Sequence, residues 1–143
     1  MAKYIRPTRK TKYHIDFDWW EKNSRNLRRY LLEHACEECR NLAESDTEKT
    51  LVDWVDPETG EVFTIDRLWY DVYAMCVENH DYLDKNLPLT SLIFRLFISN
   101  NNKPLTSVEI HQGIGKKSAG VILKMLSGQT IYKGIRPVFY STL

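Results

Sequence analysis

The order of helix signals between Thr106 and Gly128 constrains the fold of this chain more than any other feature of its sequence. Thr106-Ser107-Val108-Glu109 has the spacing of a capping box, in which the side chains of Thr106 and Glu109 each accept a hydrogen bond from an otherwise unpaired backbone N–H. The box predicts a short helix that runs to about Gln112. Gly113-Ile114-Gly115 then predicts a tight break, because glycine adopts positive φ readily.

A second helix is predicted to follow, from about Lys117 to Leu126. Its apolar residues have the i, i+3, i+4, i+7 spacing of one helix face, namely Ala119, Ile122, Leu123 and Leu126. Ser127-Gly128 is typical of a helix end. Residues 129–138 are rich in β-formers and are interrupted by Gly134, which predicts a small hairpin, or wing. An earlier apolar helix is expected over Pro88–Ser99.

This order of helix, short helix, tight turn, longer helix and wing resembles the winged helix-turn-helix superfamily, over about residues 88–138. The resemblance implies binding of duplex DNA, with the second helix of the pair in the major groove and the wing against the backbone. A homodimer is expected where two modules reach two half-sites. By position, the DNA-contacting residues are Lys116, Lys117, Ser118, Val121 and Lys124 on the second helix and Tyr132, Lys133 and Arg136 on the wing.

The composition of these segments points in the same direction. Lysines neutralise phosphates without regard to base sequence, whereas Ser118 and Val121 are able to touch base edges. The exposed face of the predicted helix lacks Arg, Asn and Gln, which are the usual bidentate readers of bases. Binding is therefore expected to depend mainly on the phosphate backbone.

Charge is segregated along the chain, although the formal net charge is only +1. Residues 1–30 carry nine Lys or Arg and three Asp or Glu, residues 31–84 carry three and fifteen, and residues 85–143 carry eight and one. Two basic segments flanking an acidic middle favour an anionic partner for the basic segments. The alternative is that the basic and acidic segments neutralise each other within the fold.

The sequence predicts an α+β fold that is mainly α, with N-terminal helices and a β-hairpin followed by the winged helix-turn-helix. Residues 1–15 are expected to form a basic flexible tail, residues 16–85 a helix–hairpin–helix domain, and residues 86–143 the winged-helix-like domain. The first domain is predicted to contain one helix over residues 25–43, strands at 50–55 and 61–65 around a proline–glycine turn, and a helix over 67–80 capped by Asp66.

Three cysteines and a histidine suggest a metal site in the first domain. Cys36 and Cys39 are three residues apart, and Cys76 and His80 are four apart, so that on helices each pair would share a face. Together they are the ligand set of a structural zinc ion, with His34 as a substitute fourth ligand. One alternative is that the cysteines are small buried apolar residues. A redox role for Cys36 and Cys39 is disfavoured by their acidic neighbours.

The sequence predicts that the protein is not an enzyme, because no set of residues typical of a catalytic site is apparent. Residues 115–118 resemble part of a phosphate-binding loop, but Ile110 stands where that loop requires glycine. No signal peptide and no apolar run of about 20 residues is present, so a cytoplasmic protein without membrane contact is expected.

The leading hypothesis is a small DNA-binding transcriptional regulator. The alternatives are a protein-docking scaffold, with Trp54, Phe63 and Tyr132 as a patch, and a Cys-x-x-Cys thiol-redox protein.

Overall fold

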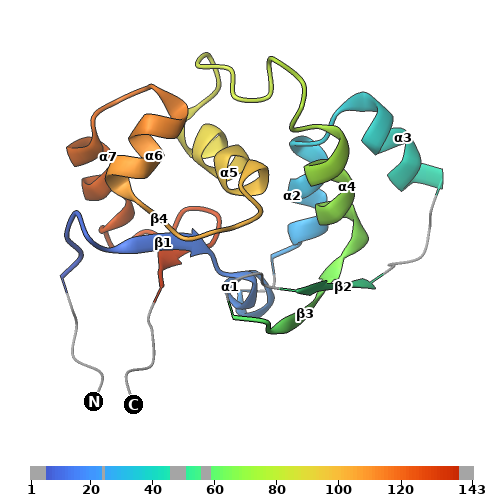
Figure 1. Cartoon of the computed structure of the whole chain (residues 1–143), viewed down its shortest axis with the longest axis horizontal. Coiled ribbons are helices and arrows are strands. Elements are labelled where there is room, and N and C mark those ends of the chain that lie inside the picture. The colour runs from blue at the N-terminus through green and yellow to red at the C-terminus, as the bar shows by residue number, and fades with distance from the viewer. Residues whose placement is uncertain (1–5, 24, 46–50, 56–58, 139–143) are drawn as a thin grey trace. The chain divides into compact units, whose positions relative to one another are not determined.

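The computed structural model describes residues 6–23, 25–45, 51–55 and 59–138. The chain divides into two compact units, of which the first combines residues 1–25 with 83–143 and the second contains residues 26–82. Helices account for most of the regular structure and the strands form small antiparallel sheets, so the expected mainly helical α+β class is confirmed (Figure 1). Among the described residues, no helix has the length and apolar character needed to cross a membrane.

A three-stranded antiparallel sheet organises the first unit. The strands are β1 (Lys12–Ile15), β4 (Leu105–Thr106) and β5 (Ile135–Pro137), with β1 in the centre. Side chains alternate across β1, so the buried Tyr13 and Ile15 face the core while His14 lies on the other face, opposite Arg136. A short helix, α1 (Phe17–Lys22), follows β1 directly.

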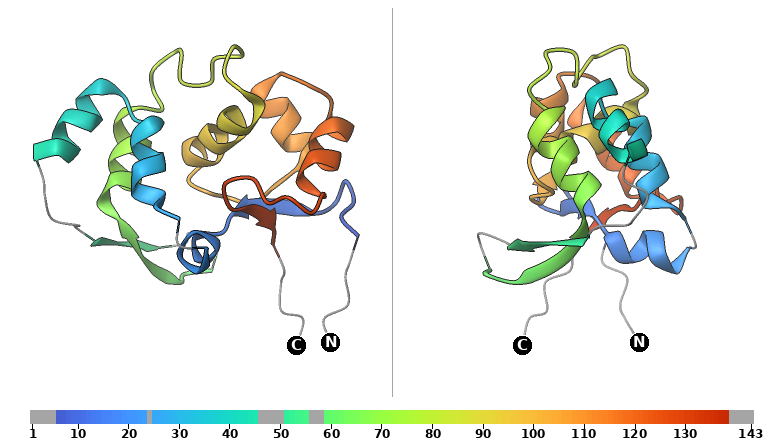
Figure 2. Two further views of the ribbon diagram at one scale, coloured as in Figure 1. Left: turned by 180° about the vertical axis from the view of Figure 1, so that it is seen from behind. Right: turned by 90° about the vertical axis from the view of Figure 1, so that its right-hand side faces the viewer.

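Three helices complete this unit, and they follow the order that the sequence predicts. They are α5 (Leu89–Ser99), α6 (Ser107–Ile114) and α7 (Ala119–Leu126), and Figure 2 shows all three on the same side of β1 and β5. The capping box of Thr106 and Glu109 begins α6, as expected. The helix continues through Gly113 to Ile114, and the break falls at Gly115, which has a φ of 64°. Ser118 is the N-cap of α7, so this helix begins later than expected from Lys117.

The N-terminal segment and the wing differ from their predictions. Residues 12–15 of the expected flexible tail form the central strand of the sheet. The expected hairpin within residues 129–138 does not form, because β5 pairs with β1 and residues 129–134 contain no strand. Lys133 and Gly134 have φ values of 54° and 78°, and this left-handed turn directs the chain into β5 alongside β1.

The second unit contains the acidic middle of the sequence. Its elements are α2 (Leu27–Glu33), α3 (Glu37–Ser45), α4 (Arg67–Met75) and a hairpin of β2 (Leu51–Val55) with β3 (Val62–Asp66). The predicted hairpin is confirmed, with Leu51 opposite Asp66 and Val55 opposite Val62. The single helix expected over residues 25–43 is instead two helices, which are separated at the C-cap of α2, His34.

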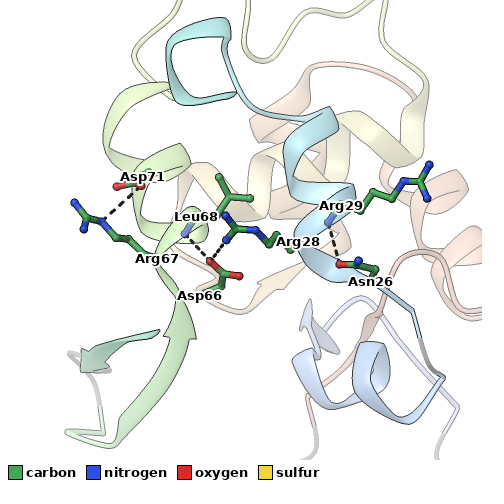
Figure 3. A network of polar contacts seen from close by, with 7 residues as sticks. All are labelled: Asn26, Arg28, Arg29, Asp66, Arg67, Leu68 and Asp71. Carbon is green, nitrogen blue, oxygen red and sulfur yellow. Dashed lines mark hydrogen bonds and ion pairs between the residues drawn. The ribbon is translucent and has the colours of Figure 1, made fainter. Parts of the chain in front are cut away.

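Asp66 links the hairpin, α2 and α4 within this unit (Figure 3). Its Oδ1 accepts a hydrogen bond from the backbone N–H of Leu68, which caps α4, and also lies 2.7 Å from Nη1 of Arg28 on α2. The predicted capping role of Asp66 is therefore confirmed. The predicted helix over residues 67–80 is shorter than expected, because α4 ends at Met75.

Candidate nucleic-acid interface

The division into two units concentrates the positive charge in the first one. Residues 1–25 and 83–143 together carry fifteen Lys or Arg and five Asp or Glu, whereas residues 26–82 carry five and fourteen. The formal charges are therefore +10 and −9. A surplus of this size in a unit of ordinary length attracts polyanions, and the attraction weakens as salt rises.

The exposed face of α7 is small and cationic. Val121 and Lys124 are exposed on α7, with the exposed Gly120 beside them, and the exposed Lys117 lies just before the N-cap with a φ of 60°. The hydroxyl of Ser118 caps the helix by accepting a hydrogen bond from the N–H of Val121 at 3.1 Å, and its O–H can still donate to a ligand. Short side chains beside two lysines leave room for a close approach of a phosphate backbone to this helix.

Lys116 has an internal role that the sequence did not reveal. Its ammonium donates hydrogen bonds to the carbonyls of Lys85 and Leu87, at 3.0 and 3.1 Å. These contacts tie the turn before α7 to the segment that precedes α5. Lys116 is thus engaged with the protein, while Lys117 and Lys124 present exposed side chains.

The ordered turn at residues 8–11 adds cations beside the sheet. The N–H of Thr11 donates to the carbonyl of Thr8 at 3.0 Å, and the N–H of Thr8 donates to Oγ1 of Thr11 at 2.8 Å. Arg9 and Lys10 are exposed within this turn, and the exposed Lys12 follows it. The sequence predicted that this stretch is basic, but not that it forms an ordered turn. The two threonines, spaced so that they can bond each other across a turn, were the sequence feature that could have indicated it.

The start of β1 lies against the C-terminal end of α7. The Tyr13 hydroxyl is 3.3 Å from Oγ of Ser127, the C-cap of α7, and Figure 1 shows this end of β1 below the helix. Lys124 belongs to the last turn of α7. The basic turn and the cationic face of α7 are therefore neighbouring features of one unit. We call them the basic face, which consists of Arg9, Lys10, Lys117 and Lys124. Lys12 is not included, because in β1 it shares with His14 the face of the sheet opposite to the buried Tyr13 and Ile15.

The residues predicted for the wing have different surroundings. Arg136 forms an ion pair with Asp16 at 3.2 Å, so its charge is partly neutralised. Lys133 is exposed, and Tyr132 is half-buried. Arg136 also faces His14 across the sheet, where burial lowers the pKa of His14 despite the opposing effect of Asp16. Arg136 contributes to this lowering because it disfavours a second positive charge.

Of the four residues predicted to bind zinc, the structure brings together the three cysteines but not the histidine. Within the second unit, the N–H of Cys36 donates to Sγ of Cys76 at 3.1 Å, and Cys39 forms a side-chain hydrogen bond with Cys76. His80 is exposed in the turns after α4, so the helical spacing assumed for Cys76 and His80 does not hold. In the described part of the chain, no group of three or more His, Cys, Asp or Glu is arranged to hold a metal ion. The zinc site stays a prediction.

The aromatic patch expected for a docking scaffold does not lie in one unit. Trp54 is half-buried in the second unit, whereas Tyr132 belongs to the first. The side chain of Phe63 lies outside the described residues. The exposed apolar residues of the hairpin are instead Leu51, Val55 and Val62, which share one face of the two strands.

No family model matches the chain, and neither the curated proteins nor the solved structures gave a significant match.

Proposed function

We propose that the first unit is a duplex-DNA-binding module that holds its ligand mainly through phosphate contacts. The observation that carries this proposal is the basic face. Arg9 and Lys10 are exposed in an ordered turn just before β1, which contacts the C-terminal end of α7 through Tyr13 and Ser127. Lys117 and Lys124 are exposed just before α7 and in its last turn. The helix itself contains no acidic residue. Lysine and arginine side chains on such a face replace the counterions of the DNA backbone, which supplies affinity without sequence preference.

The arrangement of elements supports a winged-helix mode of binding. α6 and α7 are the helix pair, and α7 is the helix that would enter the major groove. The expected wing hairpin does not form, and β5 pairs with β1 instead, where the N–H of Val138, just after β5, donates to the carbonyl of Lys12 at 2.8 Å. In this proposal the basic turn before β1 takes the place of the wing and contacts the phosphate backbone beside α7.

Phosphate-dominated binding is favoured over readout of a base sequence. The exposed residues in the middle of α7 are Gly120 and Val121, which offer no bidentate hydrogen bonds to a base. A role in transcription regulation would therefore depend on selectivity from DNA shape or from a second copy of the chain rather than from direct contacts of α7.

The test is the salt dependence of binding to a labelled DNA duplex, measured by fluorescence anisotropy. The parent is expected to bind at low salt, with log affinity falling linearly as log salt rises. The variants Lys117→Ala/Lys124→Ala and Arg9→Ala/Lys10→Ala are each expected to lower the salt slope by about 0.9 for every phosphate that the variant no longer neutralises. Their affinity should fall equally for unrelated duplex sequences.

A matched control removes the same charge elsewhere in the first unit. Two exposed lysines lie near the C-terminal end of β1. Lys22 is on α1, which follows β1, and Lys103 adjoins Asn102, whose side chain forms hydrogen bonds with the backbone of Ile15. Lys22→Ala/Lys103→Ala therefore lowers the charge by the same amount away from the basic face. Equal losses of affinity in the control and in the two test variants, or no binding by the parent at low salt, would show that the proposed interface is wrong.

A second candidate function is protein docking by the second unit. It is favoured by Leu51, Val55 and Val62, which are 62%, 55% and 61% exposed on one face of the hairpin. The formal charge of −9 on this unit favours binding to a partner with a basic surface. A defined basic partner whose binding is abolished in Val55→Asp/Val62→Asp and retained in Lys117→Ala/Lys124→Ala would support docking as a separate activity.

A further inference from the structure

The sulfurs of Cys36 and Cys76 form a contact other than the Cys36–Cys39 pair that the sequence offers for a redox role. Sγ of Cys76 lies 2.9 Å from Sγ of Cys36, although the two residues are forty positions apart. Cys36 immediately precedes α3 and Cys76 immediately follows α4. Both are free cysteines, and Cys36 is half-buried while Cys76 is buried. A small thiol reagent is therefore expected to reach Cys36 first.

The hydrogen bonds at this pair assign different roles to the two sulfurs. Cys76 donates its S–H to Sγ of Cys36, which places Cys36 as the acceptor. The N–H of Cys36 in turn donates to Sγ of Cys76 at 3.1 Å, which holds both residues in place.

We propose that Cys36 and Cys76 are a site of reversible thiol–disulfide exchange whose substrates are low-molecular-weight disulfides. This inference concerns the second unit alone and does not depend on DNA binding. The paired sulfurs lie within about 1 Å of the disulfide bond length of about 2.0 Å, which is the proximity that direct attack of one sulfur on the other requires.

The exchange proceeds in two balanced steps. The Cys36 thiolate attacks one sulfur of a small disulfide RSSR, forming a mixed disulfide and releasing RS⁻, which takes up the proton that Cys36 lost to solvent. Cys76 then attacks Sγ of Cys36, and the second RS⁻ leaves with the proton of Cys76. The protein dithiol is thereby oxidised by two electrons and RSSR is reduced to two RSH.

Cys39 is the less suitable partner for Cys36. It is buried, whereas Cys36 is half-buried. Its described hydrogen bond is to Cys76 and not to Cys36. The structure thus replaces the Cys-x-x-Cys pairing with one that would join the start of α3 to the end of α4.

The test treats the reduced full-length protein with oxidised glutathione under native conditions. Intact mass is expected to fall by about 2 Da, the loss of two hydrogens, and peptide mapping should identify a Cys36–Cys76 linkage. Addition of a dithiol reductant should restore the starting mass. A Cys36–Cys39 linkage, or three thiols that stay reduced, would overturn the proposal.

Two variants distinguish the roles of the sulfurs. Cys39→Ser should form the same linkage as the parent. Cys76→Ser should stop at the mixed disulfide, so that one glutathione remains on Cys36. Metal analysis of the untreated protein provides an independent check: zinc bound at one equivalent, with all three cysteines protected from oxidised glutathione, would replace the exchange site with a metal site.

Discussion

The indole N–H of Trp20 donates a hydrogen bond to the carbonyl of Lys133, 3.1 Å away. This contact joins α1 to the turn that leads into β5, and Gly134 in that turn has a φ of 78°. A Cβ added at Gly134 would lie 2.7 Å from Nε1 of Trp20. The ring of Trp20 therefore occupies the space that any side chain at position 134 would need.

Gly134→Ala is accordingly expected to destabilise the first unit by about 2 to 3 kcal/mol, from the strained φ together with the clash. Urea unfolding followed by tryptophan fluorescence measures the change. Gly120→Ala is the matched control, because a Cβ there meets nothing closer than 3.9 Å and alanine favours a helix. It should stabilise the protein by about 0.5 to 1 kcal/mol. Equal effects of the two substitutions would contradict the packing of Trp20 on this turn.

Removal of the helix caps is expected to separate stability from binding. Thr106→Ala eliminates half of the capping box of α6, and Ser118→Ala eliminates the N-cap of α7. Each should cost about 1 kcal/mol of unfolding free energy. Below the unfolding transition, Thr106→Ala should retain the DNA affinity of the parent. A loss of affinity in this folded variant would mean that α6 itself contacts the ligand.

The stability of the first unit is expected to fall in mildly acidic solution because of His14. The pKa of His14 is lowered from 6.5 by burial and by Arg136, so the unfolded chain takes up a proton on His14 more readily than the folded chain. Stability therefore rises with pH through the interval below 6.5 and is lost as the pH falls through it. In His14→Gln, unfolding free energies measured between about pH 7 and pH 5 should vary less than in the parent. Identical profiles would exclude this role of His14.

Asp66 is expected to be the most sensitive polar residue of the second unit. Asp66→Ala removes both the cap of α4 and the ion pair with Arg28, whose side chain is only 23% exposed. The combined loss should be about 2 to 3 kcal/mol. Asp66→Asn keeps an oxygen for the cap and removes only the charge, so it should cost about 1 kcal/mol. If the two substitutions cost the same, the ion pair rather than the cap dominates.

The features that were predicted correctly depend on a few neighbouring residues. Thr106 and Glu109 fixed the start of α6, Asp66 fixed the start of α4, and the β-prone runs at residues 50–55 and 61–65 predicted the paired strands. Residues 56–58 of the predicted turn lie outside the described residues. The single helix over residues 25–43 was predicted wrongly because apolar periodicity does not show that the backbone turns between His34 and Cys36. The candidate interface was predicted in part, since Lys117 and Lys124 are exposed but Lys116 is held by the carbonyls of Lys85 and Leu87.

By itself, the sequence determined the mainly helical class, the helix caps and the segregation of charge, because these follow from composition and from contacts between residues close in the chain. Only the tertiary structure decided that residues 12–15 form the central strand, that Asp16 pairs with Arg136, and that, among the cysteines expected to lie together, Cys36 and Cys76 bring their sulfurs into contact. These partners are separated by forty or more residues. Their selection depends on how the whole core packs, which no local pattern specifies. Sequence and tertiary structure both contribute to the basic face. The sequence supplies its charges, and β1 brings the basic turn at residues 8–11 to α7.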